Sequence, residues 1–161
     1  MVKDDIFFMS EALKEAQKAS AIGEVPVGAV IVKDNEIIAR AYNTRETEKN
    51  ALAHAELKAI EKACNALGGW RLWQCELFVT LEPCPMCAGA IINSRIKRLV
   101  FGAYDKKSGS CGSVVNLFEL PYNHKPDICG GVLEDKCKKE LSVFLKLSEK
   151  TKNSRRHSVC Y

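Results

Sequence analysis

The feature that most constrains the fold is an alternation of two hydrophobic periods along the chain. Segments with apolar residues every three to four positions, typical of helices, lie at about 4–22, 52–67, 85–93 and 134–152, and we expect a further short helix at 114–117. Short apolar runs typical of strands lie at 27–32, 37–42, 77–81, 98–102 and 128–133. A hairpin followed by alternating helices and strands predicts an α/β domain. We expect a three-layer α/β/α architecture, with helices on both faces of a mixed five-stranded sheet.

Length and charge predict a single domain with a basic end. No linker, repeat or low-complexity tract divides the 161 residues, so we expect one domain over 1–153 and a basic tail over 154–161. From Lys146 onward there are five basic residues and one acid, whereas the rest of the chain carries 19 charges of each sign. This segment either contacts phosphates or is a solvated helix end, and the sequence leaves open whether the tail is ordered.

The sequence predicts a soluble, cytoplasmic protein with reduced cysteines. No stretch approaches the ~20 apolar residues of a membrane span, and the first ten residues do not form a signal peptide. Eight cysteines are too few for a disulfide scaffold of this length. Six of them have no partner at ligand spacing, and we expect these to be small buried side chains: Cys64, Cys75, Cys111, Cys129, Cys137 and Cys160.

The remaining two cysteines belong to a constellation that suggests chemistry. Cys84 and Cys87 stand three positions apart, so on a helix both thiols face the same way. Pro85 suits the first position of that helix, which places Cys84 near its N-cap. The positive end of a helix favours thiolates, the form that binds metal. His54 begins the preceding helix and can supply a third ligand.

A Cys₂His set leaves one tetrahedral position open, which is the pattern of a catalytic zinc site. Glu56, two residues from His54, is free to act as the general acid and base beside the metal. The alternative is a structural zinc site closed by Cys111 or Cys129, which gives Glu56 no role. The combination His-x-Glu and Pro-Cys-x-x-Cys is the signature of zinc nucleobase deaminases.

At these residues the chain resembles the cytidine deaminase-like superfamily, and more closely the bacterial tRNA adenosine deaminases (TadA-like). The closer resemblance rests on motifs at 24–29, 42–43, 80–90, 94–96 and 101–109. It implies the cytidine deaminase-like fold and a zinc-dependent hydrolytic deamination of adenosine to inosine at the wobble position of tRNA anticodons. It also implies a homodimer that binds the anticodon stem-loop, with one zinc ion per subunit.

The resemblance assigns roles residue by residue. His54, Cys84 and Cys87 are implied to hold zinc, and Glu56 to transfer protons between water, the adenine ring and the departing amine. The residues implied to bind the flipped base or the anticodon loop are Asn43, Asp105, Lys107, Asn123 and Phe144.

Each of these substrate-binding assignments has a structural alternative. Asn43 ends a predicted strand and suits a turn. Asp105 and Lys107 suit an ordinary surface loop, and Phe144 suits a helix face that packs on the core. The chain also departs from the family pattern at three places that bear on RNA contacts: 50–52, Leu145 and 148–149.

Two other functions remain as alternatives. A deaminase of free nucleobases or nucleosides, such as guanine, cytosine or cytidine, shares the zinc chemistry. A non-catalytic, zinc-stabilised RNA-binding module shares the ligands but makes no use of Glu56.

Overall fold

The computed structural model describes residues 1–154, with side chains described to residue 152. In this part of the chain the helices are α1 (Asp5–Ala21), α2 (Ala55–Leu67), α3 (Pro85–Ser94), the 3-10 helix η1 (Leu117–Glu119) and α4 (Glu134–Ser154). The strands are β1 (Gly28–Lys33), β2 (Glu36–Tyr42), β3 (Cys75–Leu81), β4 (Arg98–Ala103) and β5 (Asp127–Gly130). The expected tail, 154–161, lies outside the described residues except for Ser154, which ends α4.

The strands form one mixed sheet in the order β2-β1-β3-β4-β5. Strand β1 runs antiparallel to both β2 and β3, whereas β3, β4 and β5 are parallel to one another. The hairpin between β1 and β2 turns at Asp34 and Asn35, which both have positive φ angles, as a tight two-residue turn requires. The mixed five-stranded sheet predicted from the sequence is confirmed.

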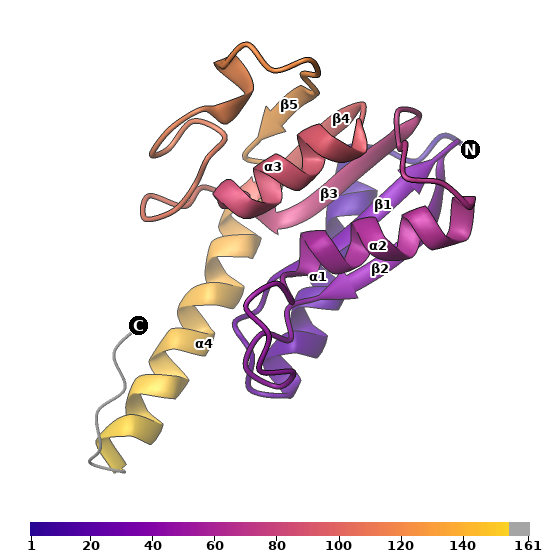
Figure 1. Cartoon of the computed structure of the whole chain (residues 1–161). Helices are drawn as coiled ribbons and strands as arrows, with labels where there is room; N and C mark the ends of the chain where they lie inside the picture. The colour runs from indigo at the N-terminus through magenta and orange to yellow at the C-terminus, as the bar shows by residue number, and fades with distance from the viewer. Residues whose placement is uncertain (155–161) are drawn as a thin grey trace.

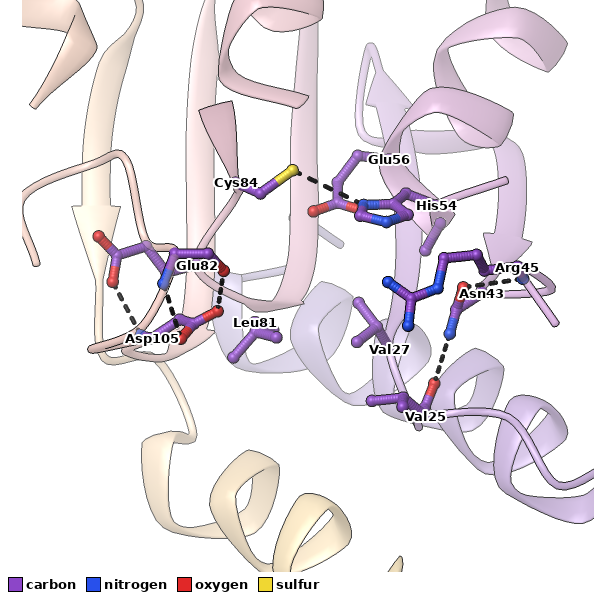
Figure 2. Close-up of a pocket in the computed structure, with 12 residues that line it drawn as sticks. Val25, Val27, Asn43, Arg45, His54, Glu56, Leu81, Glu82, Cys84 and Asp105 are labelled. Atoms are coloured by element: carbon purple, nitrogen blue, oxygen red, sulfur yellow. Dashed lines mark hydrogen bonds between the residues drawn. The ribbon is translucent and has the colours of Figure 1, made fainter. Parts of the chain in front are cut away.

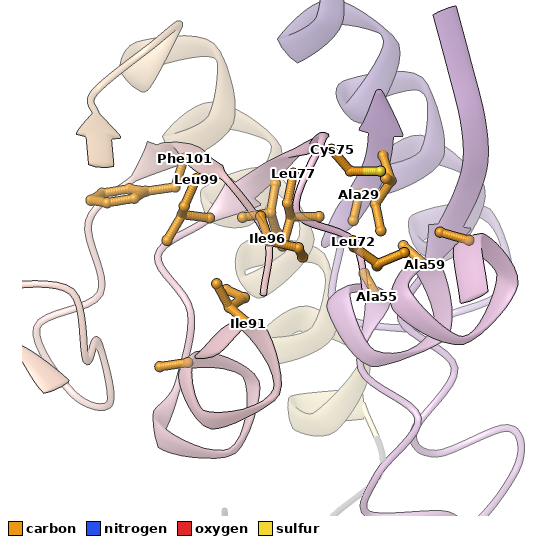
Figure 3. Packing of buried hydrophobic residues seen from close by; sticks show 14 of the residues in the cluster. Ala29, Ala55, Ala59, Leu72, Cys75, Leu77, Ile91, Ile96, Leu99 and Phe101 are labelled. Carbon is orange, nitrogen blue, oxygen red and sulfur yellow. The ribbon is translucent and has the colours of Figure 1, made fainter. Parts of the chain in front are cut away.

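Alternating side chains of the sheet support two separate hydrophobic layers. Helices α2 and α3 cover one face, where Ala59 and Ile91 pack on odd-numbered strand residues such as Leu77 (Figures 1 and 3). Helices α1 and α4 cover the other face, where Met9 and Cys137 belong to a second cluster with strand residues such as Phe78. The predicted three-layer α/β/α architecture is therefore confirmed, and α2 and α3 share the face that will carry the site.

Helix α1 lies unusually close to β1. A Cβ atom on Gly28 would lie 2.1 Å from the carbonyl oxygen of Ala12 and 2.3 Å from the amide nitrogen of Ala16. Only a residue without a side chain permits this approach.

Three predicted boundaries were wrong, each for a local reason. Helix α2 begins at residue 55 rather than 52, because Asn50 accepts a hydrogen bond from the amide of Leu52 and closes a turn first. Strand β5 ends at residue 130 rather than 133, because Gly131 and Leu133 have positive φ angles that turn the chain into α4. The short helix expected at 114–117 is a 3-10 turn at 117–119, started by the side chain of Asn116.

The expected free thiols are confirmed for the seven cysteines of the described chain, none of which forms a disulfide, and Cys160 lies outside it. Cys75, Cys111 and Cys137 are buried as predicted, whereas Cys64 and Cys129 are only partly buried. Over residues 1–154, no helix combines the length and the apolar character that crossing a membrane requires.

Candidate active site

Two helix N-termini bring the predicted ligands together. His54 is the N-cap of α2 and Cys84 is the N-cap of α3, with Pro85 in the first turn as predicted. The imidazole of His54 and the thiol of Cys84 approach each other from these two helix ends. The Nδ1 atom of His54 lies 3.7 Å from the sulfur of Cys84 and 3.5 Å from the sulfur of Cys87.

These three donors form a compact set that could hold a metal ion. One ligand atom from each of His54, Cys84 and Cys87 lies within 4.8 Å of the others. Among the side chains that the structure describes, neither Cys111 nor Cys129 joins this group, so no fourth protein ligand closes it. The arrangement is that of an open site and not of the closed structural site considered above.

The two thiols differ in their proton affinity. A hydrogen bond from Cys87 lowers the pKa of Cys84 to about 4, with His54 contributing in the same direction. The same hydrogen bond, together with burial, raises the pKa of Cys87 above its ordinary value. The pKa of His54 is raised chiefly by its hydrogen bond with Cys84. The lowered pKa favours the thiolate form of Cys84, which is the form that binds a cation.

Glu56 lies beside the three donors in the first turn of α2, and only 4% of its surface is exposed. Burial raises the pKa of Glu56 to about 7, against the opposing effects of a backbone hydrogen bond and of His54. A carboxyl group with a pKa near neutrality can both accept and return a proton.

The donors open onto a cavity of about 180 Å³. Its walls come from the segment before β1, the loop after β2, the first turn of α2, the end of β3 with the start of α3, and the loop after β4 (Figure 2). The residues that line it are Val25, Val27, Asn43, Arg45, His54, Ala55, Glu56, Leu81, Glu82, Cys84, Asp105 and Ser108. Apolar side chains thus form part of the walls, and polar groups converge from two loops.

Two of the five residues expected to bind substrate line this cavity. Asn43 is buried, donates from Nδ2 to the carbonyl oxygen of Val25 at 3.2 Å and accepts from the amide of Arg45 at 3.1 Å. Asp105 accepts hydrogen bonds from the amides of Lys107 and Ser108, at 2.9 and 3.3 Å.

The other three expected substrate-binding residues lie elsewhere. The side chains of Lys107 and Asn123 are exposed and do not line the cavity. Phe144 is partly buried and lines a second cavity, of about 510 Å³, between the end of α1 and α4. That cavity is also lined by Ser20, Gly23, Leu147, Ser148, Thr151 and Lys152.

Sequence reasoning assigned no role to three polar residues that line the first cavity. Glu82 stands within one of the motifs on which the resemblance rests, but nothing in its spacing indicates what it contacts. Ser108 also stands within one of these motifs, at 101–109, whereas Arg45 lies in the loop after β2, where no periodicity or pattern singles it out.

Comparisons with known proteins agree with this geometry. A family model described as MafB19-like deaminase matches residues 3–140. The tRNA-specific adenosine deaminase of Bacillus subtilis (strain 168) is 51% identical over 160 residues, which cover 99% of each chain.

Solved structures point in the same direction. One structure comes from a study of A-to-I editing by tRNA:A34 deaminases at the wobble position of transfer RNA. It superposes on this chain with a TM-score of 0.81 and is 46% identical in sequence. The match covers 83% of this chain and 98% of that structure's chain. The guanine deaminase of Bacillus subtilis superposes with a TM-score of 0.61 at 41% identity, covering 63% of this chain and 66% of its own. The likeness is thus longer toward the tRNA editing structure than toward the guanine deaminase, and the chain belongs to the tRNA-specific adenosine deaminases.

Proposed function

We propose that this protein is a zinc-dependent enzyme that converts adenosine to inosine by hydrolysis at the wobble position of tRNA anticodons. The observation that carries the proposal is the arrangement of His54, Cys84 and Cys87 around an open position, with Glu56 buried next to it. The names of its full-length relatives, which are tRNA-specific adenosine deaminases, support the substrate and the reaction.

The donor set fits zinc. With Zn–S bonds of about 2.3 Å and a Zn–N bond of about 2.0 Å at the tetrahedral angle, sulfur and nitrogen are separated by about 3.5 Å. The observed separations from Nδ1 of His54 are 3.7 Å to Cys84 and 3.5 Å to Cys87. Two thiolates and one imidazole also suit zinc better than magnesium or calcium, which prefer oxygen ligands.

Zinc bound at an open site of this kind supplies an activated water molecule for attack on carbon. The protein's own contribution is proton transfer by Glu56. Its carboxylate takes the proton from the attacking water and delivers it to N1 of adenine. The carboxylate then takes the second proton of that water, from the hydroxyl group added at C6, and delivers it to the amino group; the C6–N bond breaks, and inosine and ammonia are formed.

The cavity suits a flipped purine. Valine and leucine side chains offer apolar contact to the ring faces, and Asn43 offers polar contact at the edge. An asparagine amide has two N–H donors and an oxygen with two lone pairs. One donor of Asn43 is used by Val25 and one lone pair by Arg45, so one of each remains for the base.

We propose that the anticodon stem-loop approaches the cavity from the side of Asp105 and Lys107, with Asn123 and Phe144 contacting nucleotides further along. The wobble base already lies in a single-stranded loop, where extruding a base costs least. Arg45, whose side chain is 40% exposed at the cavity, is suited to a phosphate of that loop. The proposal extends to a cytoplasmic homodimer, with residues 1–153 as the deaminase domain and the basic tail at 154–161 available to RNA.

The test offers the purified protein an anticodon stem-loop with adenosine at the wobble position, alongside free adenosine, guanine and cytidine. We expect inosine only in the stem-loop. Turnover of guanine or cytidine without turnover of the stem-loop contradicts the proposal and favours a deaminase of free nucleobases or nucleosides. This is the second candidate function because the chain is similar to the structure of a guanine deaminase. RNA binding without any turnover favours the non-catalytic alternative.

A further inference from the structure

Glu82 connects the metal-ligand turn to the opposite wall of the cavity. It ends the segment that leads from β3 to Pro83 and Cys84, and only 1% of its surface is exposed. Its carboxylate reaches across to the loop that follows β4, residues 104–113 (Figure 2). That loop carries Asp105 and Ser108, which line the cavity.

Every acceptor site of this carboxylate is occupied by the loop. Oε1 of Glu82 accepts from the amides of Cys111 at 3.1 Å and Ser113 at 3.0 Å. Oε2 accepts from the amide of Asp105 at 2.9 Å and from the hydroxyl of Ser113. A carboxylate has about four lone-pair sites, so Glu82 has none left for a substrate.

Gly109 adapts the loop to this buried carboxylate. A Cβ atom on Gly109 would lie 2.4 Å from Oε2 of Glu82 and 2.4 Å from the carbonyl oxygen of Asp105. The backbone of the loop therefore closes over the carboxylate, and the amide of Ser110 adds a hydrogen bond of 2.8 Å to the carbonyl oxygen of Pro83.

We propose that Glu82 is a positioning residue: it holds Asp105 at the cavity wall and so sets the affinity for RNA, while taking no part in the proton transfers. This inference rests on the proposed function for the identity of the ligand. The charge-assisted hydrogen bonds order a loop that would otherwise have to be fixed when RNA binds, and such prior ordering improves affinity.

Glu82→Gln tests the proposal because a carboxamide cannot serve all four donors. If the NH2 group of Gln took the place of Oε1, that group would face the backbone amides of Cys111 and Ser113, neither of which can accept a hydrogen bond. If the NH2 group takes the place of Oε2, the hydroxyl of Ser113 can rotate and accept a hydrogen bond from it. Only the amide of Asp105 then loses its hydrogen-bond partner. The second orientation leaves fewer groups unpaired, so the substitution selectively releases Asp105.

We expect Glu82→Gln to raise the KM for the anticodon stem-loop by about 10- to 100-fold, the effect of losing one charge-assisted hydrogen bond. The kcat at saturating RNA and the zinc content should stay within about twofold of the wild-type values, because an interaction equally present in the ground and transition states affects KM alone. Hydrogen exchange at the amides of residues 105–113 should accelerate in the free protein.

Two further variants make the test independent of folding defects at position 82. Gly109→Ala intrudes on the same contact from the loop side and should raise KM in the same way. Glu15→Gln is the matched control, since it neutralises another buried carboxylate, which pairs with Lys18 on α1 and does not line the cavity. This control should leave KM and kcat within about twofold.

The outcomes separate the inference from the proposed function. A fall in kcat or in zinc content with KM unchanged overturns the positioning role, as does a variant with unaltered kinetics and unaltered exchange. If the wild-type protein deaminates no stem-loop, the proposed function fails. The exchange of residues 105–113 in Glu82→Gln still decides whether this carboxylate orders the loop.

Discussion

Replacing Glu56 by glutamine removes the proton carrier and changes little else. The two side chains have nearly the same shape, and Glu56 is buried beside His54 and the two thiols. Because none of the three donors is altered, we expect the variant to fold and to keep the same zinc content as the wild-type protein. Turnover should fall by at least about 10³-fold, which corresponds to about 4 kcal/mol in the activation barrier.

The size of this loss follows from the surroundings of Glu56. Two other carboxylates line the cavity, and both are engaged: Glu82 accepts four hydrogen bonds, and Asp105 accepts two from backbone amides and one from the hydroxyl of Ser108. Neither can replace Glu56 without breaking these bonds. The carboxyl group of Glu56 also takes part in two proton transfers. The loss of turnover in Glu56→Gln should therefore lie toward the upper part of the usual range for general acid–base catalysis.

The assay is single-turnover formation of inosine in an anticodon stem-loop, with zinc measured on the same preparation. Excess enzyme separates the chemical step from product release. A variant that retains zinc and deaminates at more than a tenth of the wild-type rate refutes the assignment of Glu56. Loss of zinc in the variant would show instead that the carboxylate is a ligand.

Three further outcomes are expected. Gly28→Ala should lower the free energy of unfolding in urea titrations by about 2–3 kcal/mol or more, because its Cβ atom would collide with the backbone of Ala12. Gly69→Ala is the control: a Cβ atom there has no neighbour within 4 Å, so the free energy of unfolding should change by less than about 0.5 kcal/mol. Asp5→Asn should cost about 1 kcal/mol at neutral pH, since hydrogen bonds from Arg98 hold the pKa of Asp5 below its ordinary value. That stabilisation exists above the unfolded-state pKa of Asp5 and disappears as the pH falls through its folded-state pKa. The free energies of unfolding of the wild type and of Asp5→Asn should therefore converge in acid. A difference between them that stays constant down to about pH 2 contradicts this expectation. A chelator should abolish turnover, and zinc but not magnesium should restore it, as followed by inosine formation.

The layers and the ligand set were predictable because both depend on short-range spacing. The change between helical and strand periods identified the four α-helices and the five strands of residues 1–154. Two thiols three positions apart on a helix must face the same way. Proline after Cys84 placed that residue at a helix start, as the structure has it. These features follow from the local chain alone.

The walls of the cavity were less predictable, because they depend on which loops meet in space. No pattern indicates that the carboxylate of Glu82 faces the amides of residues 105–113, some 23 or more positions away in sequence. The helical spacing of Phe144 was compatible with a core position, and its place in a second cavity depends on how α4 packs against the end of α1. The end of β5 was set by a backbone angle at Gly131, which composition does not reveal.

The reactive side chains lie at helix ends and much of the cavity wall lies in loops, and this separation has an evolutionary consequence. His54, Cys84 and Cys87 lie in the first turns or at the caps of α2 and α3, which pack on the sheet. The cavity also borders on the loops after β2 and β4, which can change length and composition independently. A chain built in this way can acquire a different substrate by altering those segments while its hydrolytic chemistry is inherited intact. Selectivity and reactivity are then separable traits, open to change one at a time in nature or in the laboratory.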